Sequence, residues 1–434
     1  MKTLSPSGTE TCSSLSSAIT FWSVRPIPII ITSNRPLQKF SMKPIIIIGA
    51  GTAAYTLARE LRKLDKATPL LIITADDGGS YSKPMLSIAF AQKKLAAQLI
   101  TQSSIQMAEQ LQAEILTGVQ VNNIDTAAKV LDTSAGPFEY AKLILAVGAQ
   151  PIRLNIGGDA SDSVLSVNHI GDYATFRDLL LPDQRASARV VILGAGLIGC
   201  EFADDLSGHG HAVTLIDPNT LPLAALAPPP LSQGLQKALT SRGIKLSLNT
   251  TATSIDHLDG ALAITLANGE TITADLVLSA VGLRPDLRLA QAAQLKTERG
   301  ILVDSHGRTS IEDIYALGDC AEYLLDKEGR TGPLPYIAPI MSAARAIAKT
   351  LTGDHTPIDL KDSPVIVKTP SYPLALVPPP RHALEGGRWE TEQDGERTIC
   401  RFIDAQGVMV GFGVAPQETK VRQALLAALG TVIA

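Results

Sequence analysis

The chain has 434 residues, of which 45% are hydrophobic and 18% charged, so it can bury the cores of two or three domains. Its net charge of −4 argues against general nucleic-acid binding, and no apolar run approaches the roughly 18 residues that span a bilayer. The four cysteines form no close pair, which suggests neither a redox dithiol nor a metal site and fits a reducing cytoplasm.

Residues 1–41 differ from the rest of the chain because they are rich in Ser and Thr and contain one acidic residue, Glu10. Three interpretations are open. In the first, Met42 is the true start and the preceding stretch is an over-extended gene model. In the second, the stretch is an acid-poor transit peptide. In the third, it is a secretory signal, although it lacks a clean apolar region. In each case we expect this extension, mis-annotated or disordered, to lie outside the fold.

The first nucleotide-binding signal follows a predicted buried strand at residues 45–48, where four isoleucines precede G-x-G-x-x-A. Gly49 permits a tight turn from strand to helix, and Gly51 lets the backbone approach a pyrophosphate at the helix N-terminus. Ala54 is the small residue needed where the helix meets the strand. The same residues also fit a helix packed closely on a strand with no ligand.

The first module continues as a βαβ unit with further strands. The predicted elements are a helix at about 52–64, a strand at 69–73, a helix near 103–113, a strand around 114–121 and a strand at 143–147.

The second module repeats the glycine turn with Gly194, Gly196 and Gly199, followed by a helix and a strand at 212–216. Asp217 ends that strand roughly 20 residues after the glycines, where an acid hydrogen-bonds a ribose 2′-hydroxyl and repels a 2′-phosphate. The pattern therefore favours NADH over NADPH. Alternatively, Asp217 only caps the following turn.

A second repeat supports a duplication of the module. Residues 143–151 and 277–285 both contain A-V-G-x-x-P, and each follows its glycine turn at a similar distance. Between them, Asn268-Gly269 separates two alternating runs and predicts a β-hairpin inserted in the second module. Two related nucleotide-binding modules are therefore expected.

The last hundred residues predict a smaller α+β domain. A helical pattern at 338–351 has Pro339 in its first turn, where a missing N–H costs nothing. Short strand patterns, three prolines at 378–380 and a final helix near 417–429 follow.

These motifs, together with Gly-Asp-Cys-Ala at 318–321, resemble the FAD-dependent pyridine-nucleotide reductases from Met42 to the C-terminus. Residues 76–87 and 365–370 resemble the rubredoxin–NAD(+) reductases within that group. The resemblance implies an α/β, glutathione-reductase-like fold with two Rossmann-like modules and a small C-terminal α+β domain. The domains expected are a discontinuous FAD-binding domain (42–152 and 286–335), an NADH-binding domain (153–285) and a C-terminal domain (336–434).

The resemblance also implies the cofactor contacts, with FAD as the resident cofactor and NADH as the electron donor. Those expected for FAD are Gly49, Ala50, Gly51, Thr52, Ala53, Ala54, Thr74, Ala75, Lys83, Val121, Asp319, Ile337 and Lys368. Those expected for NADH are Gly194, Gly196, Gly199, Glu201, Asp217 and Gly282.

Two of these positions have local alternatives. Asp319 is expected to accept a hydrogen bond from the ribityl chain, but it also fits a helix N-cap. Glu201 is expected to face the nicotinamide beside the flavin, but it also fits a first-turn acid favoured by the helix dipole.

The chain departs from the family pattern in two places. The usual acid after the second strand falls near Thr74, so adenine-ribose contact is expected from the backbone of Thr74 and Ala75. The lysine that pairs with the nicotinamide-side glutamate in ferredoxin-type reductases is replaced by Ile88. Lys83 or Lys368 would have to take over that pairing.

Residues 76–110 contain no cysteine, whereas disulfide reductases and NADH peroxidases of this type need one or two near the flavin. No catalytic side chain beyond the cofactors is therefore required, and electrons are expected to leave singly for an external acceptor. By resemblance the acceptor is rubredoxin, an acidic iron protein, which would dock near Arg345, Lys349 and Lys368. Reduced rubredoxin would then pass its electrons to an alkane-oxidising or oxygen-detoxifying system.

The sequence is also compatible with two other functions. One is reduction of another ferredoxin or a quinone by the same fold, and the other is a flavin-binding regulatory protein with little turnover. No dimerisation signature is evident in residues 336–434, which favours a monomer.

Overall fold

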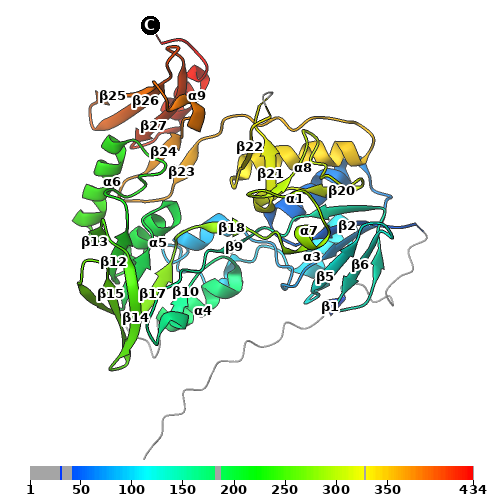
Figure 1. Ribbon diagram of the computed structural model, residues 1–434, viewed down its shortest axis with the longest axis horizontal. Coiled ribbons are helices and arrows are strands. Elements are labelled where there is room, and N and C mark those ends of the chain that lie inside the picture. The colour runs from blue at the N-terminus through cyan, green and yellow to red at the C-terminus, as the bar shows by residue number, and fades with distance from the viewer. Residues whose placement is uncertain (1–29, 32–41, 181–186, 327–328, 434) are drawn as a thin grey trace, which may run out of the picture.

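The computed structural model describes residues 30–31, 42–180, 187–326 and 329–433. It forms two α/β modules side by side, with a smaller domain seated on the second module (Figure 1). Within these residues no helix is long and apolar enough to cross a membrane.

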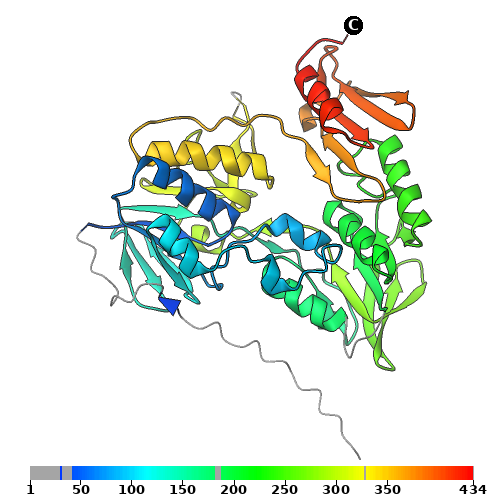
Figure 2. The ribbon, with the colours of Figure 1, turned by 180° about the vertical axis from the view of Figure 1, so that it is seen from behind.

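The first module is built on a six-stranded sheet in the order β1-β4-β3-β2-β8-β20, parallel except for β1. Figure 2 shows α1 and α8 side by side against this sheet. The isoleucines of β2 are all buried, as expected for a strand covered on both faces. The elements of the sheet and its covering helices are β2 (Ile45–Ile48), α1 (Thr52–Leu64), β3 (Leu70–Ile73), α3 (Ser104–Leu111), β4 (Glu114–Thr117), β8 (Lys142–Leu145), β20 (Ile314–Ala316) and α8 (Ile337–Leu351).

Smaller elements complete the first module, with a three-stranded sheet β5-β6-β7 and another in the order β19-β21-β22. They are β5 (Val121–Asp125), β6 (Val130–Thr133), β7 (Phe138–Glu139), α7 (Arg288–Ala292), β19 (Ile301–Leu302), the short helix η4 (Gly318–Cys320), β21 (Ala321–Leu324) and β22 (Thr331–Pro333).

Strand β1 (Ile30–Ile31) contradicts the expectation that all of residues 1–41 lie outside the fold. Ile30 and Ile31 pair antiparallel with β4, at the edge of the sheet. Residues 1–29 and 32–41, including Cys12, lie outside the described residues.

The second module carries a five-stranded parallel sheet in the order β10-β17-β11-β12-β13. The predicted hairpin is confirmed, because Gly269 donates a backbone hydrogen bond to Leu266 in the turn between β15 and β16. The elements are β10 (Val164–Leu165), α4 (Ile170–Leu180), β11 (Arg189–Leu193), α5 (Leu197–Gly208), β12 (Ala212–Asp217), α6 (Pro229–Ser241), β13 (Lys245–Leu248), β14 (Ala252–Leu258), β15 (Ala261–Leu266), β16 (Thr271–Ala274) and β17 (Leu276–Ser279), with the short helix η2 (Ser161–Ser163).

The two A-V-G-x-x-P repeats meet where the modules join. Their exits form β9 (Ala149–Pro151) and β18 (Leu283–Pro285), which pair antiparallel with each other. The two connections between the modules therefore lie side by side in one two-stranded sheet.

One segment of the first module packs on the second. It contains the short helix η1 (Lys83–Ile88) and α2 (Ala96–Leu99), and its apolar side chains enter the core beneath α4 and α5. Those side chains are Leu86, Ala89, Phe90 and Leu99.

The C-terminal domain is an antiparallel sheet in the order β23-β24-β27-β26-β25 with α9 against it. It rests on α6 (Figure 1). Leu231 of α6 lies against Gly413 of β27. Its elements are β23 (Val365–Val367), β24 (Leu374–Val377), the short helix η5 (Arg381–Ala383), β25 (Arg388–Asp394), β26 (Arg397–Ile403), β27 (Met409–Ala415) and α9 (Thr419–Ala428).

The expected start of this domain at residue 336 does not match the packing of α8. Ala343, Ala344 and Ile347 are fully buried in the core of the first module, because the small residues of α8 allow close approach to α1. We therefore propose that the C-terminal domain begins after Leu351.

Candidate active site

The first glycine turn forms a cradle at the N-terminus of α1. Gly49 has a φ of +108°, and a Cβ there would lie 2.3 Å from the carbonyl oxygen of Ala146, so the turn itself requires glycine. Gly51 has a φ of −80°, and no described heavy atom lies within 4 Å of a Cβ built on it. Since the fold does not require glycine there, the open space fits a pyrophosphate bound at close range.

The second turn repeats this geometry at α5. Gly194 has a φ of +101°, and a Cβ on Gly199 would overlap the carbonyl oxygen of Gly194 at 1.9 Å. Gly196 again faces open space among the described residues. In both turns the helix starts with no side-chain cap from the described part of the chain, so its first N–H groups and positive dipole end are available to an anion.

The residues expected at FAD gather at one edge of the first sheet, because parallel strands end on the same side. The carboxyl ends of β2, β3 and β20 lead to the glycine turn, to Thr74 and to Gly318-Asp319. A Cβ on Gly318 would lie 2.8 Å from that of Ala53, so η4 abuts the first turn of α1.

The other expected FAD contacts lie in the same module. Ala50 and Ala53 pack partly buried against its core, and Thr52 is the first residue of α1. Val121 is buried at the start of β5, and Ile337 is 46% exposed at the start of α8.

The backbone groups of Thr74, which is expected to contact adenine-ribose, take part in the sheet pairing. Its N–H donates to the carbonyl of Leu116, and its carbonyl accepts from Val119, because the chain continues the sheet pairing here. Ala75 is exposed, and no backbone hydrogen bond involves it within the described residues. Of this pair, only Ala75 keeps a free backbone N–H.

Lys83 lies among carboxylates at the first residue of η1. Burial lowers the pKa of its ammonium group, whereas the charges of Asp319, Asp172 and Asp76 act in the opposite direction. Lys83 is therefore close to the expected ribityl-binding residue Asp319.

Glu201, in the first turns of α5, is the centre of the candidate site. Its side chain is fully buried, and Oε2 lies 2.6 Å from Nζ of Lys368. Oε1 accepts from the backbone N–H of Lys368 at 2.8 Å, and Oε2 also accepts from the hydroxyl of Ser87. Of the two lysines expected to replace the one missing at Ile88, Lys368 is therefore the one that does so.

Ser87 was not among the expected site residues. It is the last residue of the stretch 76–87 that resembles the rubredoxin–NAD(+) reductases, and it precedes Ile88, the position of the missing lysine. That position was the signal from which a contact with Glu201 could have been inferred.

Asp217 is 8% exposed at the end of β12. Oδ2 accepts from the N–H of Ala195 in the glycine turn at 2.6 Å, and Oδ1 accepts from the backbone and side chain of Asn219, each at 2.8 Å. Asp217 therefore does cap the following turn, as the alternative interpretation expects. Three donors on a carboxylate with about four acceptor positions leave about one for a ribose hydroxyl.

The described cysteines are free and buried, as expected of Cys200 and Cys320. Burial raises the pKa of Cys320 to about 12 and also raises that of Cys200, so neither thiol is ionised at neutral pH.

The expected docking cations are separated in the structure. Arg345 and Lys349 lie on α8 with side chains 62% and 46% exposed, near the acids Glu60 and Asp354. Lys368 instead directs its ammonium into the ion pair with Glu201.

Comparison with known proteins agrees with the motifs. Residues 43–349 match the family described as pyridine nucleotide-disulphide oxidoreductase, and residues 357–429 match the rubredoxin binding C-terminal domain. The rubredoxin-NAD(+) reductase of Acinetobacter baylyi is 45% identical over 86% of this chain and 93% of its own. The nitric oxide reductase FlRd-NAD(+) reductase of Aeromonas hydrophila is 38% identical over 88% of this chain and 96% of its own.

The fold is also seen in solved structures. A covalent putidaredoxin reductase–putidaredoxin complex superposes with a TM-score of 0.80 over 90% of this chain and 94% of that chain, at 23% identity. The predicted α/β fold with two nucleotide-binding modules and a small C-terminal domain is confirmed.

Proposed function

Because the chain belongs to the pyridine nucleotide-disulphide oxidoreductase family, we propose that it carries electrons from NADH through FAD to rubredoxin. The observation that carries this proposal is Lys368, which lies within the rubredoxin-binding match and completes an ion pair beside the second glycine turn. The C-terminal domain and the second nucleotide-binding module are thus joined by a buried ion pair at Glu201.

The two cradles hold the cofactors in this proposal. Gly51 and the first turn of α1 would bind the FAD pyrophosphate, and Asp319 would accept a hydrogen bond from the ribityl chain. Bound FAD would supply the change from two-electron to one-electron chemistry. Helix α8 starts at Ile337 without a side-chain cap from the described residues, and its positive end would favour negative charge on the flavin ring.

Within this arrangement Glu201 faces the nicotinamide, and Lys368 neutralises its charge. A buried carboxylate without a partner would be strongly disfavoured, so the ion pair lets an acid remain at this position. The described cysteines are free and buried and form no disulfide, which supports direct delivery to an external acceptor.

We expect Asp217 to set the preference for NADH. Asp217→Asn should reduce the ratio of NADH to NADPH efficiency about 10- to 100-fold, because a charged hydrogen bond and a repulsive charge are both lost. Steady-state kcat/KM for the two nucleotides measures this ratio. Asn219→Ala removes the side-chain contact with Asp217 but keeps the backbone N–H bond and the carboxylate, so an equal fall in that variant would assign the effect to the turn.

For docking, we propose that Arg345 and Lys349 attract an acidic acceptor while Lys368 acts indirectly through Glu201. Changing Arg345 and Lys349 to Glu should raise the KM for rubredoxin about tenfold at low ionic strength and much less at high ionic strength. The matched control is Lys245→Glu, since Lys245 is exposed at the start of the edge strand β13 of the second module. An unchanged KM in the double variant would contradict electrostatic docking at α8.

A panel of acceptors tests the proposed function itself. With NADH, turnover of rubredoxin should exceed that of a [2Fe–2S] ferredoxin and of a quinone. Faster turnover with either of the others would replace the acceptor, and no turnover with any would favour a flavin-binding regulatory protein. We further propose that the protein is cytoplasmic and monomeric. Sedimentation of the FAD-loaded protein would check the monomeric state.

A further inference from the structure

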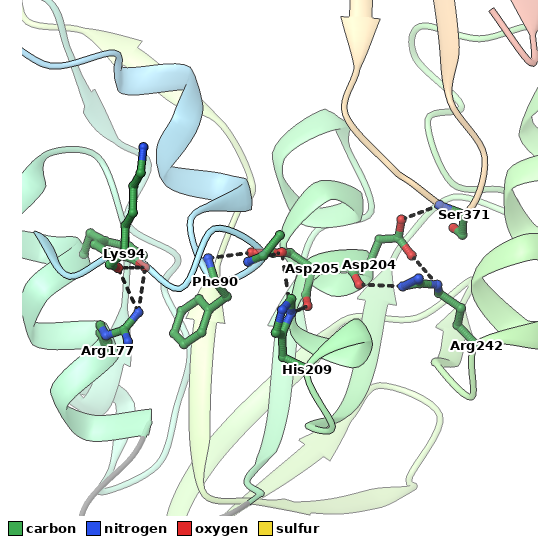
Figure 3. Close-up of polar contacts among 10 residues, drawn as sticks. Phe90, Lys94, Arg177, Asp204, Asp205, His209, Arg242 and Ser371 are labelled. Atoms are coloured by element: carbon green, nitrogen blue, oxygen red, sulfur yellow. Dashed lines mark hydrogen bonds and ion pairs between the residues drawn. The ribbon is translucent and has the colours of Figure 1, made fainter. Parts of the chain in front are cut away.

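Three buried acids lie on one face of α5. Glu201, Asp204 and Asp205 are spaced three and four residues apart and are at most 3% exposed. Each binds a segment that comes from outside the sheet of the second module. Figure 3 shows Asp204 and Asp205 reaching in different directions from the same helix, toward Ser371 and Phe90.

Asp205 fastens the segment that carries Ser87. Its two oxygens accept the backbone N–H groups of Phe90 at 3.0 Å and Ala91 at 2.9 Å. Burial raises the pKa of Asp205 to about 6, while those N–H groups and His209 act in the opposite direction. The carboxylate is therefore mostly ionised at neutral pH and can accept both bonds.

Helix α4 holds the same segment from the other side. Arg177 donates to the carbonyl of Lys94 at 2.9 Å, and its guanidinium lies 5.2 Å from the centre of the Phe90 ring. The segment is thus fixed to the second module by Asp205 at Phe90 and Ala91 and by Arg177 at Phe90 and Lys94 (Figure 3).

Asp204 fastens the loop that carries Lys368. Oδ2 accepts the backbone N–H of Ser371 at 2.9 Å, and Oδ1 lies 3.2 Å from Nε of Arg242. Arg242 also donates to the carbonyl of Asp204 at 3.3 Å. Arg242 therefore orients the carboxylate that binds the loop.

The two contacts have the same relation to Glu201. Ser87 lies three residues before Phe90, and Lys368 lies three residues before Ser371. We propose that Asp204 and Asp205 are positioning residues, which place Lys368 and Ser87 respectively on Glu201. This inference rests on the proposed role of Glu201 beside the nicotinamide.

Stopped-flow reduction of the FAD-loaded protein by NADH tests the inference. Asp205→Ala should slow flavin reduction at saturating NADH about tenfold or more, because small displacements near a reacting centre are costly, and should leave the dissociation constant of NADH within about twofold. Asp205→Asn, which keeps the shape and one of the two acceptor atoms, should slow flavin reduction less than Asp205→Ala.

Coupling between residues separates positioning from a general loss of structure. In a Ser87→Ala background, Asp205→Ala should change the rate less than about twofold, and Asp204→Ala should behave likewise in a Lys368→Met background. The matched control is Asp275→Ala. The carboxylate of Asp275 accepts hydrogen bonds from the backbone N–H and the guanidinium of Arg189, which lies at the end of β11 away from the second glycine turn. That variant should keep the wild-type rate.

Equal slowing by Asp205→Ala with and without Ser87 would overturn the positioning role, as would equal slowing by Asp275→Ala. Wild-type protein whose flavin NADH does not reduce would instead overturn the proposed function. The two failures are thus distinguishable in one set of traces.

Discussion

Lys368→Met is expected to lower the free energy of unfolding by about 3 kcal/mol, because it leaves the fully buried carboxylate of Glu201 without its counter-ion. The ammonium group is removed while the backbone N–H of residue 368 and the hydroxyl of Ser87 remain. Urea unfolding of the FAD-loaded protein at pH 7 measures the loss.

A double variant provides the control. Adding Glu201→Gln to Lys368→Met should return most of the stability, since no charge is then left buried. Adding Ile88→Lys to Lys368→Met should also recover stability, because related ferredoxin-type reductases place the pairing lysine there. Full stability of Lys368→Met alone would mean that the ion pair contributes nothing to the fold.

Gly51→Ala is expected to weaken FAD binding about 100-fold or more, since the added methyl group occupies the space that the pyrophosphate needs and prevents its bonds to the helix N–H groups. The unfolding free energy of the apoprotein should change by less than about 1 kcal/mol, because the φ of −80° suits alanine and no described atom is in the way. Flavin fluorescence titration and urea unfolding measure the two effects separately.

The second cradle offers a matched variant. Gly196→Ala should leave FAD binding unchanged and raise the KM for NADH, because Gly196 has the same open geometry in the other module. If Gly51→Ala retained FAD with wild-type affinity, the first cradle would not be the pyrophosphate site.

The sequence predicted those parts of the molecule that short-range backbone rules determine. Gly49 and Gly194 needed positive φ at the end of a buried strand, and both adopt it. The Asn268-Gly269 hairpin likewise depends on local turn chemistry, and it forms as expected.

Contacts between distant segments were harder to predict. The chain between Lys368 and Glu201 is long, and a lysine gives no local sign of its partner, so Lys83 and Lys368 were equal candidates. The packing of α8 on α1 was missed because an alanine-rich helix fits either domain. Asp204 and Asp205 were overlooked, although acids on the buried face of a helix are themselves a signal that partners exist.

The most direct test of the central claim is an anaerobic stopped-flow experiment that mixes the FAD-loaded protein, one equivalent of NADH and excess oxidised rubredoxin. We expect that the visible absorption of two rubredoxins per NADH is lost, at a rate that depends on rubredoxin concentration and falls at high ionic strength. A flavin that NADH reduces rapidly, but that leaves rubredoxin oxidised, would contradict it.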